Sequence, residues 1–116
     1  MSRESAIARA ERYFDGGTFR DDLARRVAFK TESQVPESRP HLSTYLEQEI
    51  KPAFERMGFS VRIFPNPTGN HGPFLVATRI EDPKLPTVLS YGHGDVIRGL
   101  EPQWRKGLDP WTLTVE

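Results

Sequence analysis

Apolar residues recur at intervals of three and four in the first half of the chain, the spacing that one face of a helix requires. Residues 3–15 show this spacing and predict a helix that the glycine pair at 16–17 ends. A second helix is expected behind Thr18 as its cap, with Asp21 in a capping-box position, and it should fade near Thr31. Two short amphipathic helices therefore open the chain.

A third amphipathic segment runs from about His41 to Met57. Pro52 lies inside this segment, and because proline has no N–H donor we expect it to kink the helix or restart it. Gly58 follows directly and is well placed to end the helix in the left-handed conformation. The pattern thus predicts a long helix with one interruption.

The period of the pattern then changes from helical to alternating. Residues 59–64 alternate apolar and polar positions and predict a strand, and residues 74–80, FLVATRI, predict a second. Residues 87–91, TVLSY, are mostly apolar and predict a third strand, buried on both faces. Residues 111–116 alternate again and predict a fourth strand, after a loop over 100–110.

The order of these elements predicts an α/β fold, in which helices pack on a mixed β-sheet. A length of 116 residues suits one domain. The last predicted strand has no turn or polar tail after Val115. We therefore expect residues 1–116 to be a single but incomplete domain, the N-terminal portion of a longer protein.

The composition removes several classes of function. Sixteen basic residues balance sixteen acidic ones, so no strongly basic surface for nucleic acid is expected. The chain has no cysteine, which excludes disulfides and thiolate metal ligands and suits a reducing compartment. No segment has the apolar length of a signal peptide or a membrane span. We expect a cytoplasmic protein that binds neither nucleic acid nor a membrane.

The candidate chemistry lies in LSYGHGDVIRG, residues 89–99. His93 stands two residues before Asp95, and in an extended segment such residues point to the same side. A neutral imidazole binds a metal through one ring nitrogen while a carboxylate accepts the N–H of the other. Gly92 and Gly94 allow close approach of a ligand. Taken alone, the motif favours a simpler interpretation, a tight turn with an exposed histidine.

The sequence around this motif favours a metal-binding role for His93 over a simple turn. The stretch PTVLSYGHGDV (86–96), followed by Trp104 and by Leu108-Asp109-Pro110-Trp111, resembles the M20 family of zinc metallopeptidases. This family includes aminoacylases, carboxypeptidases, dipeptidases and succinyl-diaminopimelate desuccinylases. Residues 27–38 and the run Met57-Gly58-Phe59 also fit its pattern. The resemblance implies that the chain is the N-terminal part of a zinc-exopeptidase-like, three-layer α/β/α catalytic domain.

The resemblance implies a role for two residues. His93 matches a ligand of one of two zinc ions, with cobalt and manganese as alternative metals, and Asp95 matches the catalytic-site aspartate that orients this histidine. The implied reaction is hydrolysis, by a water that the two zinc ions activate, of peptide or N-acyl amide bonds in small substrates that carry a carboxylate. Gly94 and Arg98 depart from the family pattern, which leaves the subfamily open, and no substrate-binding residue is assigned.

A catalytic zinc site needs about three protein ligands plus water. This sequence offers one strong candidate, and in the family the bridging aspartate and the catalytic glutamate come later in the chain. We therefore expect these residues beyond Glu116, and we expect the 116-residue chain alone to be inactive. A homodimer of the intact protein is a further expectation.

A competing interpretation is a non-catalytic α/β module that associates with a partner or with itself through an exposed sheet edge. The other conspicuous residues fit structural roles. We expect His41 and His71 at the surface, Trp104 and Trp111 in packing with Trp104 bordering the site, and Asp109-Pro110 in a turn.

Overall fold

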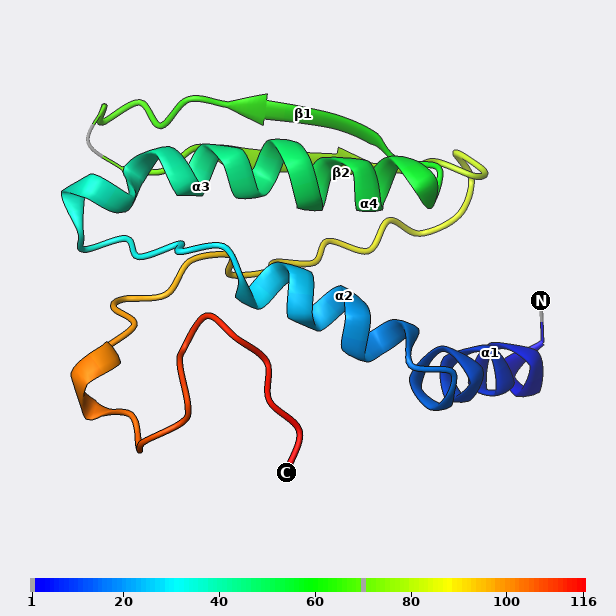
Figure 1. The fold of residues 1–116 in the computed structure, drawn as a ribbon. Helices are drawn as coiled ribbons and strands as arrows, with labels where there is room; N and C mark the ends of the chain where they lie inside the picture. The colour runs from blue at the N-terminus through cyan, green and yellow to red at the C-terminus, as the bar shows by residue number, and fades with distance from the viewer. Residues whose placement is uncertain (1, 70) are drawn as a thin grey trace. The chain divides into compact units, whose positions relative to one another are not determined.

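The computed structural model describes residues 2–69 and 71–116. Its contacts divide the chain into two compact units. Unit 1 comprises residues 1–29 and 100–116, and unit 2 comprises residues 30–99. Unit 1 holds the helices α1 and α2, whereas unit 2 holds the third helical segment and the sheet (Figure 1). That residues 1–116 form one incomplete domain stays a prediction.

In unit 1, α1 (Arg3–Asp15) and α2 (Thr18–Val27) confirm the two predicted N-terminal helices. Gly17 joins them with a positive φ of 83°, a conformation that favours glycine. The predicted cap was wrong, because Thr18 is already helical and Gly17 occupies the cap position without a side-chain hydrogen bond. The helix also ends at Val27, before the expected Thr31.

An aromatic cluster joins the two helices of unit 1. The ring of Phe19 lies 6.0 Å from that of Tyr13 and 5.5 Å from that of Phe14, measured between centroids. The Tyr13 hydroxyl donates a hydrogen bond to Asp22 at 2.6 Å. This bond raises the pKa of Tyr13 and lowers the pKa of Asp22, which also pairs with Arg25.

The predicted strand at 111–116 is wrong, since no strand is found there. The segment follows a short 3₁₀ helix, η3 (Glu101–Gln103), and the Trp111 indole donates to the Glu101 carboxylate at 2.8 Å. Asp109 Oδ1 accepts the Trp111 backbone N–H at 2.8 Å, which confirms the predicted turn. Side-chain hydrogen bonds therefore hold this segment, and no strand of unit 1 is described that could pair with it.

In unit 2, one helical segment consists of α3 (Arg39–Tyr45), the π-helical turn η2 (Leu46–Ile50) and α4 (Lys51–Arg56), preceded by the 3₁₀ turn η1 (Pro36–Ser38). The backbone N–H of Lys51 donates to the carbonyl of Leu46, one residue further back than in an α-helix. Pro52 follows directly and has no N–H to give. The predicted interruption at Pro52 is therefore confirmed, as a π-turn.

The end of α4 is a Schellman motif. Gly58 has a φ of 82°, and its N–H donates to the Glu55 carbonyl at 2.9 Å. The N–H of Phe59 donates to the Phe54 carbonyl at 3.1 Å, and the two phenyl rings meet edge to face at 5.2 Å. The predicted stop at Gly58 is confirmed, and it aims the chain into the first strand.

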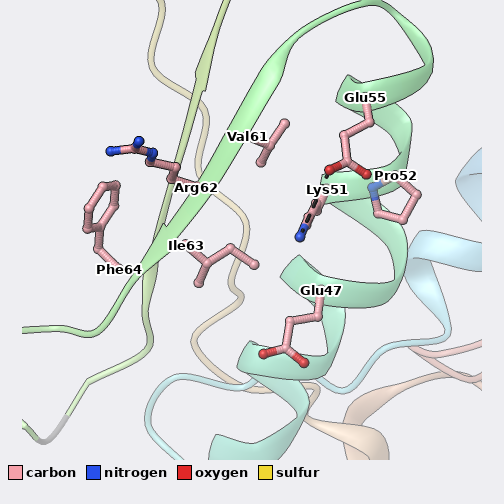
Figure 2. A pocket seen from close by; sticks show the side chains of 8 residues that line it. All are labelled: Glu47, Lys51, Pro52, Glu55, Val61, Arg62, Ile63 and Phe64. Atoms are coloured by element: carbon pink, nitrogen blue, oxygen red, sulfur yellow. Dashed lines mark ion pairs between the residues drawn. The ribbon is translucent and has the colours of Figure 1, made fainter.

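The strands β1 (Ser60–Phe64) and β2 (Phe74–Thr78) form an antiparallel hairpin and confirm the first two predicted strands. Their side chains alternate between two faces. Val61 and Ile63 point toward the helical segment, whereas Arg62 and Phe64 point away from it (Figure 2). The hairpin therefore half-buries one face against the helix, as the alternating pattern of residues 59–64 indicated.

The third predicted strand, TVLSY at 87–91, is wrong. Val88 and Leu89 are 85% and 95% exposed, and no strand pairing is described for the segment. A strand buried on both faces needs neighbours at its edges and above and below. The described sheet holds only β1 and β2, so no mixed sheet is found among the described residues. The observed fold is a small α/β arrangement of three helical segments and a two-stranded antiparallel sheet.

The apolar core of unit 2 is small. Leu42 of α3 is buried, and Gly72 lies so close that a Cβ there would be 2.9 Å from a Leu42 methyl carbon. Within the described ranges, no helix combines the length and the apolar character that crossing a membrane requires.

Candidate metal-binding corner

The loop that carries His93 and Asp95 is held by its backbone to the segment that precedes η1. The N–H of Val96 donates to the Thr31 carbonyl at 2.9 Å, and the N–H of Ser33 donates to the Val96 carbonyl at 2.8 Å. These bonds make Glu32 and Val96 an isolated parallel bridge. One step of parallel pairing therefore fixes the chain directly after Asp95.

His93 and Asp95 are in contact, as the sequence predicted. Nδ1 of His93 lies 3.0 Å from the backbone oxygen of Asp95 and 3.2 Å from its Oδ1. A carbonyl oxygen only accepts hydrogen bonds, so Nδ1 is the nitrogen that carries the proton. Within the described residues, Nε2 has no hydrogen-bond partner. When the ring is neutral, this geometry leaves a lone pair at Nε2.

The imidazole lies at the surface of unit 2. The His93 side chain is 61% exposed and that of Asp95 is 32% exposed. The Tyr91 ring stands edge to face with the imidazole, at 6.5 Å between centroids. An imidazole with one nitrogen fixed and the other free and accessible is suited to bind a metal ion.

Gly94, a departure from the M20 pattern, has a local explanation. A Cβ at Gly94 would lie 3.3 Å from a ring carbon of Tyr45 in α3, tighter than ordinary van der Waals contact. At Gly92 a Cβ would meet nothing within 4 Å. The absence of a side chain at Gly94 therefore lets the loop lie against Tyr45. No neighbouring atom requires a glycine at position 92.

Sequence reasoning missed Glu32. Glu32 is only 8% exposed, and each of its carboxylate oxygens accepts a hydrogen bond. Oε1 accepts the Gly99 N–H at 2.8 Å, and Oε2 accepts the Ser38 hydroxyl at 3.0 Å. The surrounding sequence, TESQVPES, looks like an ordinary polar turn, so its composition gave no signal of a buried acid.

The corner offers one strong ligand. Among the described residues, no group of three or more His, Asp or Glu side chains is arranged to hold a metal ion. His41 in α3 and His71 in the loop between the strands are exposed, as expected. Trp104 belongs to unit 1 and His93 to unit 2, so a role for Trp104 beside the site stays a prediction.

A groove lies elsewhere in unit 2, between the helical segment and β1 (Figure 2). Glu47, Lys51 and Glu55 line it from the helix, and Lys51 pairs with Glu55 at 3.9 Å. Val61 and Ile63 line it from the strand. Neither His93 nor Asp95 borders this groove, so it is separate from the candidate metal corner.

Comparison with protein families, curated proteins and solved structures finds no match to this chain. The resemblance to the M20 family therefore rests on the motif residues themselves, and membership stays a prediction.

Proposed function

We propose that this chain supplies one corner of the metal site of an M20-type hydrolase. In this proposal His93 binds one zinc ion through Nε2, and Asp95 orients the imidazole. The observation that supports it is the contact of His93 Nδ1 with both acceptors of Asp95, at 3.0 and 3.2 Å, which leaves Nε2 free. The hydrogen bond goes to the Asp95 backbone oxygen, and the carboxylate lies beside the same nitrogen, close to the arrangement in which an acceptor fixes the tautomer of a metal-binding histidine.

Each residue then has a chemical task. Asp95 accepts a hydrogen bond from the Nδ1–H, keeps the ring from rotating and makes Nε2 a stronger donor to a cation. Zinc, when bound, supplies Lewis acidity, which polarises a carbonyl and lowers the pKa of water. The proposal has the general base and the other ligands supplied by polypeptide outside this sequence. Its substrates are peptides or N-acyl amino acids with a free carboxylate.

The three-layer α/β/α architecture belongs to the same proposal. The face of the hairpin that points away from the helical segment carries exposed Phe64, Phe74 and Val76. Together with the exposed segment 87–91, this face is more apolar than a fully solvated surface needs to be. The exposed apolar face of the hairpin supports a further layer of polypeptide on that side of the sheet.

The decisive variant is His93→Ala, made in a protein that contains this sequence together with the remaining ligands. We expect it to lose one zinc equivalent and most of its amide hydrolysis, because its only ligand from this chain is gone. Zinc content by mass spectrometry and turnover of N-acyl amino acids measure both effects. Asp95→Ala should weaken zinc binding by about 10–100-fold, since it removes the carboxylate beside Nδ1 and leaves the backbone oxygen in place.

The matched control is His71→Ala, which removes an exposed histidine outside the corner. It should keep both zinc and turnover. Full zinc content together with full turnover in His93→Ala would contradict the proposed role.

A second candidate is the non-catalytic association module. Val88, Leu89 and Tyr91 form a run of exposed apolar side chains, which favours contact with another polypeptide. This candidate predicts that His93→Ala changes nothing, while Leu89→Asp abolishes association in a sedimentation experiment. The two functions are therefore separated by the same pair of variants.

A further inference from the structure

A buried carboxylate ties together two segments that lie far apart in the sequence. Glu32 is 8% exposed, and its two oxygens accept hydrogen bonds from different partners. The Gly99 N–H reaches Oε1 at 2.8 Å, and the Ser38 hydroxyl reaches Oε2 at 3.0 Å. Both Ser38 and Gly99 are themselves buried. A buried carboxylate is costly unless it is hydrogen-bonded, so these two bonds are needed wherever Glu32 stays inside.

The same residue also takes part in backbone pairing. Glu32 forms a parallel bridge with Val96, whose N–H and carbonyl are bonded to Thr31 and Ser33. The chain after Asp95 is therefore held at two points. Its start, Val96, is held by the backbone, and its end, Gly99, is held by the Glu32 side chain.

Holding residues 96–99 at two points also fixes the orientation of His93, the candidate metal ligand. Asp95 immediately precedes Val96, and both of its contacts with His93 depend on where its backbone lies. Fixing residues 96–99 therefore fixes the acceptors that hold Nδ1. No similar hydrogen bonds are described for residues 87–92, on the other side of His93, so the orientation comes from the C-terminal side of the loop.

We propose that Glu32 is a positioning residue for the His93–Asp95 pair. It holds the loop through Gly99 and thereby keeps the proton on Nδ1 and the lone pair on Nε2. The link from Glu32 to catalysis rests on the proposed function. The effect of Glu32 on the His93 tautomer does not, because it can be measured in the absence of a metal ion.

The test uses the 116-residue chain and three variants. Glu32→Ala removes both hydrogen bonds. Glu32→Gln keeps a carboxamide oxygen for the Gly99 N–H, and Ser38 can accept from its NH₂ group instead of donating. Glu37→Ala, which removes an exposed acid of η1, is the matched control. Nitrogen-15 NMR of the His93 ring reports which nitrogen carries the proton, and amide exchange reports the Gly99 N–H.

We expect Glu32→Ala to shift the His93 tautomers toward the mixture of an unrestrained histidine side chain and to expose the Gly99 N–H to exchange. Zinc affinity at His93 should fall by about tenfold, the lower end of what losing a supporting group costs. Glu32→Gln should retain most of the wild-type tautomer, and Glu37→Ala should retain all of it. A general loss of folding would not give this graded series.

Equal tautomer ratios in Glu32→Ala and Glu37→Ala would overturn the proposal. If Glu32→Ala fails to fold, Ser38→Ala, which removes only one of the two bonds, should move the tautomer ratio in the same direction by a smaller amount, and an unchanged ratio there would also overturn it. A wild-type chain in which zinc leaves His93 untouched would contradict the proposed function alone, because the tautomer shift still decides the role of Glu32.

Discussion

Two segments of unit 2, on either side of the loop that carries His93, differ sharply in how they are bonded to the rest of the unit, although both carry apolar residues. Residues 87–91 are exposed and have no strand partner among the described residues. Residues 96–99 are bonded to Thr31, Glu32 and Ser33 through backbone and side chain. His93 and Asp95 lie between the two segments. The candidate site is therefore attached on one side only.

The difference shows that apolar character does not by itself make an ordered element. Val88 and Val96 have the same side chain, but only the backbone of Val96 has donors and acceptors within reach. An ordered extended segment needs partners for its backbone hydrogen bonds, and the segment at 31–33 provides them for Val96, which itself stays 42% exposed, and not for Val88. The local hydrogen-bond supply, rather than hydropathy, separates the two segments.

The largest effect is expected from a proline at Val96, compared with a proline at Val88. Val96→Pro removes the N–H that bonds to the Thr31 carbonyl at 2.9 Å. We expect it to cost about 2 kcal/mol of local stability, equivalent to roughly thirtyfold faster exchange of nearby amides. The Ser33 amide, which donates to the Val96 carbonyl, is the reporter for hydrogen exchange.

Val88→Pro is the matched control for this experiment. The Val88 N–H has no described hydrogen bond. Its loss should therefore change the free energy of the opening that lets the Ser33 amide exchange by no more than about 0.5 kcal/mol. Equal protection losses in both variants would mean that segment 87–91 is bonded as firmly as 96–99.

A smaller effect is expected at the two glycines that flank His93. Gly94→Ala places a Cβ 3.3 Å from the Tyr45 ring, so the ring or the loop must give way. We expect a loss of about 1 kcal/mol in the free energy of unfolding, measured with urea, together with a shift of the Tyr45 ring signals. Gly92→Ala meets nothing within 4 Å and should stay within about 0.5 kcal/mol of the wild type.

If instead Gly92→Ala proved the more destabilising of the two, the Tyr45 contact would not explain the glycine at 94. The pair of variants therefore tests whether this departure from the M20 pattern reflects local packing.

Local signals predicted the parts of the fold that local interactions decide. The helix at 3–15, the interruption near Pro52, the stop at Gly58 and the two strands at 59–64 and 74–80 each depend on residues close in sequence. The strands predicted at 87–91 and 111–116 depended on pairing with distant segments, and a pattern of apolar residues does not say whether such a partner is present.

The candidate corner divides in the same way. The contact between His93 and Asp95 followed from their spacing, because residues two apart in an extended chain share a side. Glu32 lies 67 positions before Gly99, and only the folded chain shows that its carboxylate reaches that amide. Long-range positioning of this kind has no signature in a single sequence.

The most direct test of the account is a zinc titration of the 116-residue chain, followed by nitrogen-15 NMR of its three histidine rings. We expect weak binding in which Nε2 of His93 responds first and its Nδ1 keeps the proton, while the rings of His41 and His71 respond only at higher zinc concentration. A response of all three rings at the same concentration, or binding through Nδ1 of His93, would contradict the claim that Asp95 presents His93 as a metal ligand.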